Sequence, residues 1–209
     1  RPVETDMSID NARLIRRLEK PKGRVDVVID TDTYNEIDDQ YALSYLIKSD
    51  EKLDLKAIYA APFFNEKSTG PADGMEKSYR EIMNVLTLLE REDLKEHVYR
   101  GSTEYLPSET EPVISDAAKD LAKRAMDYTE EHPLYVVAIA AITNVASALL
   151  LNPDIKNRIV LIWLGGNATN WPDNKEFNLY QDVAGARIVF GCGVPLVQLP
   201  CMGVVSAFT

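Results

Sequence analysis

Five acidic side chains occur within the ten residues DTDTYNEIDD (30–39), directly after a run of Val and Ile residues. Between Arg24 and Lys48 there is no other Lys or Arg, so the sequence supplies no local counter-cation. Carboxylates at a partly buried strand end repel one another and take up protons, which raises their pKa values. A helix N-terminus would favour Asp38 and Asp39 by only about 0.3–1 kcal/mol each, which is too little to gather all five acids.

A hard divalent cation would relieve this repulsion, because Ca²⁺ and Mg²⁺ bind carboxylate and carbonyl oxygens. The alternative is that the acids serve as a helix N-cap and as solvated surface charge, and their spacing leaves both interpretations open. An EF-hand loop is excluded. Its fifth, sixth and twelfth positions require an oxygen ligand, Gly and Glu, and this chain has Tyr34, Asn35 and Tyr41 there.

The hydrophobic pattern predicts the elements that position this loop, with strands alternating with helices along the chain. The predicted strands are 25–30, 55–63, 97–101, 134–140 and 158–166, the predicted helices are 8–19, 38–49, 74–93, 115–132 and 144–152, and two apolar segments follow at 183–192 and 195–200. This order implies right-handed βαβ units and an α/β fold with a doubly wound, mostly parallel sheet and helices on both faces. Ligands of such sheets bind beyond the carboxyl ends of the strands.

Length and composition favour one α/β domain over residues 25–209, preceded by a helical leader over residues 1–24. The net charge of -10 and the pI near 4.8 disfavour nucleic acid and anionic membranes as partners. No apolar signal segment begins the chain, and its apolar runs are shorter than the roughly 20 residues of a membrane span. We therefore expect a cytoplasmic protein, with Cys192 and Cys201 as small buried thiols that form no disulfide.

The segment DTDTYNEIDDQYAL resembles the signature of the inosine-uridine-type nucleoside hydrolases. Three further segments resemble that family in order and spacing: VVAIAAITNVASALL, RIVLIWLGG and KEFNLYQDVAGARIVF. The start of the signature, DTDTY, also matches in part the first motif of haloacid-dehalogenase-type phosphatases, with Asp30 as the nucleophile. Four ordered segments are more specific than this one partial match, and they favour the hydrolase family.

The resemblance implies a nucleoside-hydrolase-like fold with a Rossmann-type core and a metal-dependent N-ribohydrolase activity. Such an enzyme hydrolyses the N-glycosidic bond of a ribonucleoside to give ribose and free base, with bound Ca²⁺, or with Mg²⁺ as the alternative. An oxocarbenium-like transition state needs a carboxylate to accept the proton of water and anionic surroundings to stabilise positive charge. The resemblance also implies a small-molecule nucleoside as the partner and a homo-oligomer, either a dimer or a tetramer.

Carried over by position, the resemblance assigns roles to individual residues. Asp32 corresponds to the general base; the metal ligands correspond to Asp32, Asp39 and the backbone carbonyl of Thr143; and the substrate-binding residues correspond to Asp38, Asn65, Asn170, Glu176 and Asn178. Asp30 would support the site from behind, and Trp171 would stack on the base or cover the site.

The chain departs from the family pattern in three places. The loop between Asp32 and Asp38 is two residues longer, so that Asn35 or Glu36 is expected to enter the site. The loop 167–175 does not align cleanly, which leaves Asn167 and Asn174 as rivals of Asn170 for the 5′ end of the ribose. Family members continue beyond the position of Thr209 with another aspartate ligand and often a histidine. We expect a C-terminally incomplete enzyme, and the alternative is a shortened, noncatalytic ribose- or nucleoside-binding relative.

Overall fold

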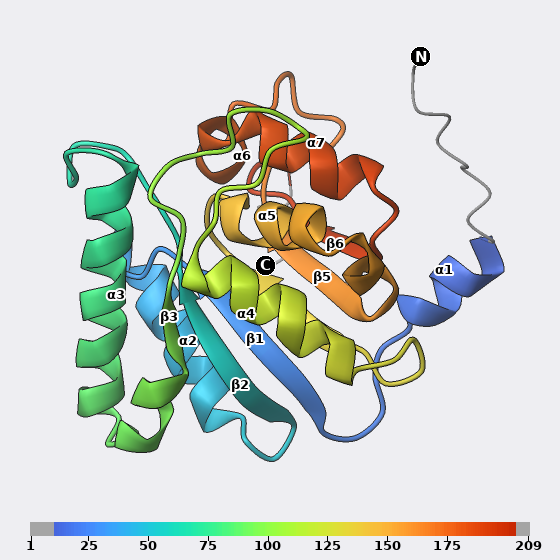
Figure 1. Ribbon diagram of the computed structural model, residues 1–209, viewed down its shortest axis with the longest axis horizontal. Helices are drawn as coiled ribbons and strands as arrows, with labels where there is room; N and C mark the ends of the chain where they lie inside the picture. The colour runs from blue at the N-terminus through green and yellow to red at the C-terminus, as the bar shows by residue number, and fades with distance from the viewer. Residues whose placement is uncertain (1–10, 204–209) are drawn as a thin grey trace.

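The computed structural model describes residues 11–203 and contains a six-stranded sheet in which every strand pairing is parallel (Figure 1). The strand order is β3-β2-β1-β4-β5-β6. The strands are β1 (Val25–Thr31), β2 (Leu53–Ala60), β3 (Val98–Arg100), β4 (Leu134–Ala138), β5 (Ile159–Leu164) and β6 (Leu196–Leu199). The predicted α/β class is confirmed, and the sheet is parallel throughout.

The described chain contains seven α-helices, of which all but the first lie between strands: α1 (Asn11–Arg17), α2 (Ile37–Lys48), α3 (Pro71–Leu88), α4 (Asp116–Arg124), α5 (Thr143–Leu151), α6 (Phe177–Gln181) and α7 (Val183–Gly191). Three short 3-10 helices complete it: η1 (Glu92–His97), η2 (Ala125–Asp127) and η3 (Pro153–Asn157). The helix predicted over 115–132 was too long. It gives way to η2 after Arg124, and Tyr128, directly after η2, has an extended backbone.

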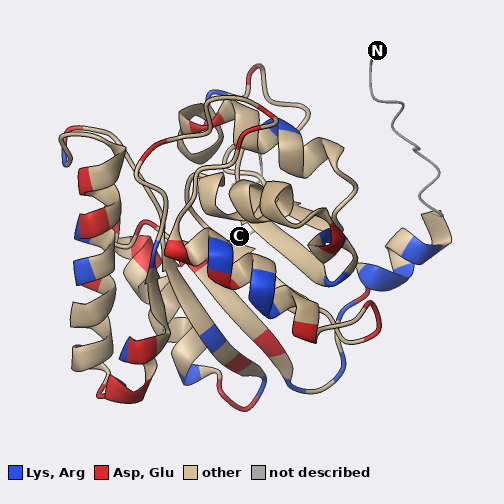
Figure 2. Cartoon of the chain, in the orientation of Figure 1, with Lys and Arg blue, Asp and Glu red and all other residues tan. Residues whose placement is uncertain are grey.

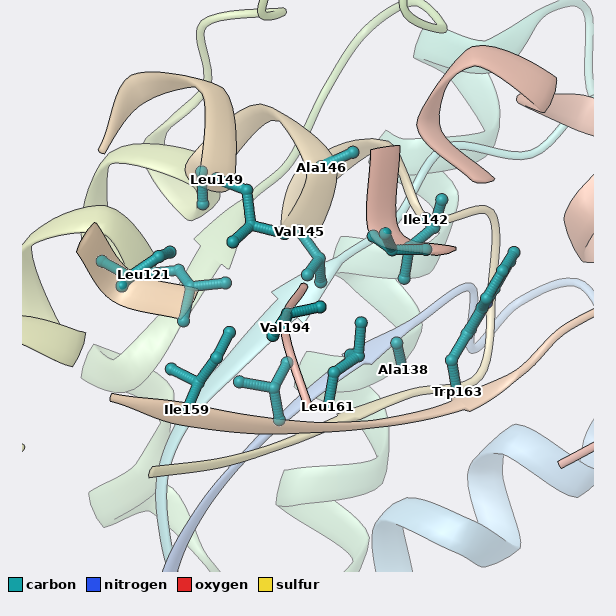
Figure 3. Packing of buried hydrophobic residues seen from close by; sticks show 14 of the residues in the cluster. Leu121, Ala138, Ile142, Val145, Ala146, Leu149, Ile159, Leu161, Trp163 and Val194 are labelled. Atoms are coloured by element: carbon teal, nitrogen blue, oxygen red, sulfur yellow. The ribbon is translucent and has the colours of Figure 1, made fainter. Parts of the chain in front are cut away.

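The helices cover the two faces of the sheet as separate layers. On one face α4, α5 and α7 enclose the larger core, and Figure 3 shows Leu161 and Trp163 of β5 on the side of the sheet that faces Val145 and Leu149 of α5. On the other face α2 and α3 pack on β1 and β2 through a second cluster that includes Ile29. Fully burying a side chain of this size stabilises the fold by about 1.5–3 kcal/mol. The strand order runs outward from β1 to β2 and β3 on one side and from β4 to β5 and β6 on the other, so the direction of the crossovers reverses between β1 and β4.

The N-terminal helix α1 is tied to the domain by its arginines. Arg13 donates to Glu130 at 2.6 Å, and Arg17 donates to the backbone carbonyls of Lys156 at 3.2 Å and Ile159 at 2.9 Å. The start of the predicted helix 8–19 lies outside the described residues. The division into a leader and a domain remains a prediction, although the part of the leader that is described contacts the domain directly.

No helix within residues 11–203 combines the length and the apolar content that crossing a membrane would require.

Asn144, the second residue of α5, fastens the central strands to one another. Its amide nitrogen donates to Asp30 Oδ1 at 2.7 Å and to the carbonyl of Ala60 at 3.1 Å, and its amide oxygen accepts from the backbone N–H of Ser102 at 2.7 Å. One buried side chain thus joins β1, β2, the loop after β3 and α5. Gly101 permits this close approach, because a Cβ atom there would overlap the Ala60 carbonyl oxygen and the Asn144 amide.

We therefore expect Gly101→Ala to destabilise the protein by about 1–3 kcal/mol, the usual cost of overpacking a buried site. The control is Gly191→Ala at the end of α7, where an added Cβ would meet no atom within 4 Å. That change should be neutral or stabilising by up to about 1 kcal/mol, because alanine favours the helix over the unfolded chain. Denaturant unfolding measures both changes, and equal effects of the two substitutions would contradict the close packing at Gly101.

Candidate active site

A pocket of about 330 Å³ opens at the carboxyl ends of β1, β4 and β5. Its walls come from the β1–α2 loop, from Ile139 after β4, from Leu164 and Asn167 at the end of β5, and from residues between 171 and 178. Cys201 and Met202 line it from the segment after β6. This is the point at which the strand order reverses, where open α/β sheets bind their ligands.

Three carboxyl groups are buried at the end of β1 on the floor of this region. Asp30, Asp32 and Asp39 are 0%, 2% and 5% exposed. Burial raises the pKa of Asp30 and of Asp39 to about 7. Burial, and after it the charge of Asp39, raise the pKa of Asp32 well above its ordinary value. Asp38, one residue before Asp39, lines the pocket and is exposed to solvent.

The two ends of β1 differ in how their charges are balanced. At the amino end, Lys56 of β2 lies 3.6 Å from Asp26 and 2.7 Å from Asp54, and Figure 2 shows acidic residues on β1 and both signs of charge on β2. At the carboxyl end, the hydrogen-bond donors to the buried carboxylates are neutral: the Thr31 hydroxyl donates to Asp39, and Asn144 donates to Asp30. The ion pairs of the described chain do not include these carboxylates, so no salt bridge offsets their repulsion.

This donor set fits a hard divalent cation. Asp30 Oδ2 is buried with no hydrogen-bond partner in the described part of the chain, and buried carboxylates without a counter-charge are costly. Oxygen ligands are those that Ca²⁺ and Mg²⁺ prefer. Residues 11–203 contain no group of three or more His, Cys, Asp or Glu side chains that could hold a metal ion. A cation here would therefore need ligands other than Asp32 and Asp39 from carbonyls, amides, water or other protein segments.

Glu176 and Asn178 also line the pocket and are fixed by the backbone. Glu176 caps α6, accepting from the backbone N–H groups of Asn178, Leu179 and Gly166 at 2.7–2.9 Å. The Asn178 amide nitrogen donates to the carbonyls of Leu164 at 2.9 Å and Ile139 at 3.2 Å. Both side chains are therefore held rigidly, while carboxylate and amide oxygens have lone pairs left for a ligand. The helix α6 was missed in the sequence because local caps, rather than apolar periodicity, define it.

Five of the predicted site residues line one pocket: Asp32, Asp38, Asp39, Glu176 and Asn178. Three lie outside its lining. Thr143 is fully buried at the start of α5, Asn65 is half-buried behind the β1–α2 loop, and Asn170 is exposed. Of the three asparagines proposed for the 5′ end of the ribose, only Asn167 lines the pocket. Its amide nitrogen is held by the carbonyl of Asp173 at 2.9 Å.

Asp182, which the sequence interpretation did not single out, supports Thr143. It is 2% exposed, accepts from the Thr143 hydroxyl at 2.6 Å and caps α7 through the N–H of Gly185 at 2.8 Å. An aspartate directly before an apolar helical run is a recognisable N-cap signal. Its contact with Thr143 depends on tertiary packing, which the sequence pattern does not reveal.

The expectation for the cysteines was partly wrong. Both thiols are free, as expected, but Cys192 is only half-buried, and Cys201 is exposed and lines the pocket. Cys201 follows the short edge strand β6, where backbone pairing comes from one side only. Trp171, which is 40% exposed, also lines the pocket.

Comparison with known proteins matches the model of the family "inosine-uridine preferring nucleoside hydrolase" to residues 27–206. Among curated relatives, the pyrimidine-specific ribonucleoside hydrolase RihA of Escherichia coli is 30% identical over 183 residues. That match covers 77% of this chain and 56% of RihA, so the chain spans little more than half the length of this relative.

Solved structures show the same fold. A plant nucleoside hydrolase, PpNRh1, matches with a TM-score of 0.62 and 25% identity over 84% of this chain and 59% of its own. The purine-preferring ribonucleoside hydrolase of Gardnerella vaginalis matches with a TM-score of 0.66 and 23% identity over 83% of this chain and 60% of its own. Because the family model matches most of this chain, the chain belongs to the inosine-uridine preferring nucleoside hydrolase family.

Proposed function

We propose that the protein hydrolyses the N-glycosidic bond of ribonucleosides to ribose and free base in a metal-dependent reaction. The observation that carries this proposal is that the buried pair Asp32 and Asp39 lines the same pocket as Glu176 and Asn178. Uncompensated carboxylates on one wall suit a cation and a developing positive charge. Rigid oxygen-bearing side chains on the other wall suit the hydroxyl groups of a sugar.

Asp32 acts as the general base in this proposal. Its pKa is raised by burial and by the charge of Asp39, and a base with a raised pKa accepts a proton from water more readily. A Ca²⁺ or Mg²⁺ ion held by Asp32, Asp39 and the Thr143 carbonyl would lower the pKa of a bound water and orient the sugar. Asp32 takes the proton that the attacking water releases.

The ribose is held by Asp38, Glu176 and Asn178 in this arrangement. The anionic wall stabilises the positive charge that spreads over the ribose ring as the base departs. Asn65 and Asn170 are further substrate-binding candidates from the family resemblance, and each would need a movement or an intermediate residue to reach the pocket, since neither lines it. The proposal extends to nucleoside salvage in the cytoplasm by a dimer or tetramer.

The phosphatase alternative finds no support in this geometry. Its nucleophile would be Asp30, which is fully buried, is hydrogen-bonded to Asn144 and lies outside the lining of the pocket. A nucleophile must reach its substrate. The noncatalytic nucleoside-binding alternative uses the same pocket and is separated from hydrolysis by measuring turnover.

The raised pKa values predict how stability depends on pH without metal. A carboxyl whose folded pKa lies near 7, as for Asp30 and Asp39, binds more protons in the folded than in the unfolded protein, where its pKa is about 4. Its stabilising contribution is complete below about pH 4 and is lost as the pH rises toward about 7. We expect the melting temperature of chelator-treated protein to fall as the pH rises from about 4 to about 7.

Ca²⁺ should reverse this loss, because it binds the ionised carboxylates. Its stabilisation should be larger at about pH 8 than at about pH 5, and a hundredfold excess over Kd corresponds to about 2.7 kcal/mol. Asp39→Asn should flatten the pH dependence and remove most of the Ca²⁺ effect, whereas Asp127→Asn in the exposed η2 should change neither. A melting temperature that rises with pH in the chelated protein would overturn the proposed carboxylate cluster.

Asp32→Asn tests the reaction itself. We expect the substitution to lower kcat at least about a hundredfold, the usual share of a general base, while the folded state is retained because a buried repulsion is removed. Release of reducing sugar from a panel of purine and pyrimidine ribonucleosides with Ca²⁺ measures turnover, and Asp127→Asn is the control. Saturable nucleoside binding by the unsubstituted protein without turnover would favour the noncatalytic alternative.

A further inference from the structure

The lengthened β1–α2 loop places Asn35 in the wall of the pocket. Asn35 is 4% exposed and lines the pocket beside Asp32. Its backbone N–H donates to the carbonyl of Asp32 at 2.6 Å, which closes a tight turn. The extra residues of the loop therefore fold inward and bring an amide side chain to the catalytic carboxylate.

A chain of side-chain hydrogen bonds runs outward from Asp32 through Asn35. The Asn35 amide nitrogen donates to Asp32 Oδ2 at 3.2 Å, and the Asn35 amide oxygen accepts from the amide nitrogen of Asn65 at 2.7 Å. The Asn65 oxygen in turn accepts from the backbone N–H of Lys67 at 2.9 Å. The Lys67 ammonium also donates to the backbone carbonyl of Asn35, so the segment after β2 holds the turn from outside.

Position relative to the pocket separates the roles of the two amides. Asn65 uses one N–H and one lone pair on protein groups and lies outside the pocket lining. Asn35 uses one N–H and one lone pair on protein groups, and an amide offers two of each. Asn35 therefore retains a donor and an acceptor in the wall of the pocket, which is the complement of a hydroxyl group.

We propose that Asn35 is the residue that hydrogen-bonds a ribose hydroxyl, and that Asn65 acts through it as a positioning residue, with Lys67 fixing the turn. The inference rests on the proposed nucleoside hydrolysis and deepens it. The inserted loop transfers the contact with the sugar from the segment after β2 to the turn after β1. Asn35 also orients Asp32, so sugar binding and the general base are aligned by one side chain.

The test compares Asn35→Ala, Asn65→Ala and the double variant, with Asn84→Ala on the exposed side of α3 as control. For each protein kcat and KM are measured with the best ribonucleoside of the panel and with its 2′-deoxy and 3′-deoxy analogues. We expect Asn35→Ala to lower kcat/KM for the ribonucleoside about tenfold to a hundredfold, the range for a lost buried hydrogen bond. Its loss should shrink for the one analogue that lacks the contacted hydroxyl.

Asn65→Ala should have a smaller effect that disappears in the Asn35→Ala background, because a positioning residue acts only through its partner. Asn35→Gln, which keeps the amide, should recover part of the discrimination between ribonucleoside and deoxynucleoside. Melting temperatures identify any variant that fails to fold. If Asn35→Ala does not fold, the Asn65→Ala and Asn35→Gln variants still decide the proposal through their discrimination between the sugars.

The results separate this inference from the proposed function. If the unsubstituted protein releases ribose and Asn65→Ala, rather than Asn35→Ala, loses sugar discrimination, the assignment to Asn35 is overturned and hydrolysis stands. If there is no turnover, calorimetric binding of the ribonucleoside and its deoxy analogues replaces the kinetic readout, so hydrolysis fails while the Asn35 contact is still measured. Absence of both turnover and binding overturns both proposals.

Discussion

Electrostatic repulsion among carboxylates buried at the carboxyl end of β1 is the constraint around which the site is built. Each carboxyl group is oriented by a neutral donor: Asp30 by Asn144, Asp39 by the Thr31 hydroxyl and Asp32 by Asn35. Neutral donors fix the position of a carboxylate without cancelling its charge. A basic side chain would have stabilised the cluster and also removed its capacity to attract a cation or an oxocarbenium-like sugar. The neutral donors therefore leave the negative charge in place and fix only the orientation of each carboxylate.

The parallel topology explains why distant segments can reach this cluster. Because the crossovers run in opposite directions from β1 and β4, no helix fills the space beyond the carboxyl ends of these neighbouring strands. The loops after β1 and β5, together with residue 139 after β4, line that space. The backbone fixes Asn178 in the pocket lining, because its amide nitrogen donates to the carbonyl of Ile139, which follows β4, and to the carbonyl of Leu164, which ends β5. The sheet thus brings Glu176 and Asn178 to the same pocket as the buried carboxylates.

Sequence patterns predicted the fold and the acidic floor, because β-branched runs and charge spacing are local signals. The positions that the patterns did not decide depend on tertiary contacts. The loop 167–175 left Asn167, Asn170 and Asn174 as rivals, and of these only Asn167 lines the pocket. Asn65 was placed on the substrate by resemblance, but the two inserted residues set Asn35 in front of it. An insertion can change which side chain lines a pocket without changing the motif on either side, and alignment by motif does not show that change.

The cost of the cluster connects stability to function. Raised carboxyl pKa values mean that the folded protein without a ligand is least favoured at neutral pH, where the proposed reaction needs Asp32 ionised. A cation that binds only the folded state offsets this penalty by mass action. Strain of this kind at a site is tolerated when the surrounding core supplies enough stability, and the layers on both faces of the sheet provide it. The same burial that weakens the free protein therefore gives the site its preference for a positively charged ligand.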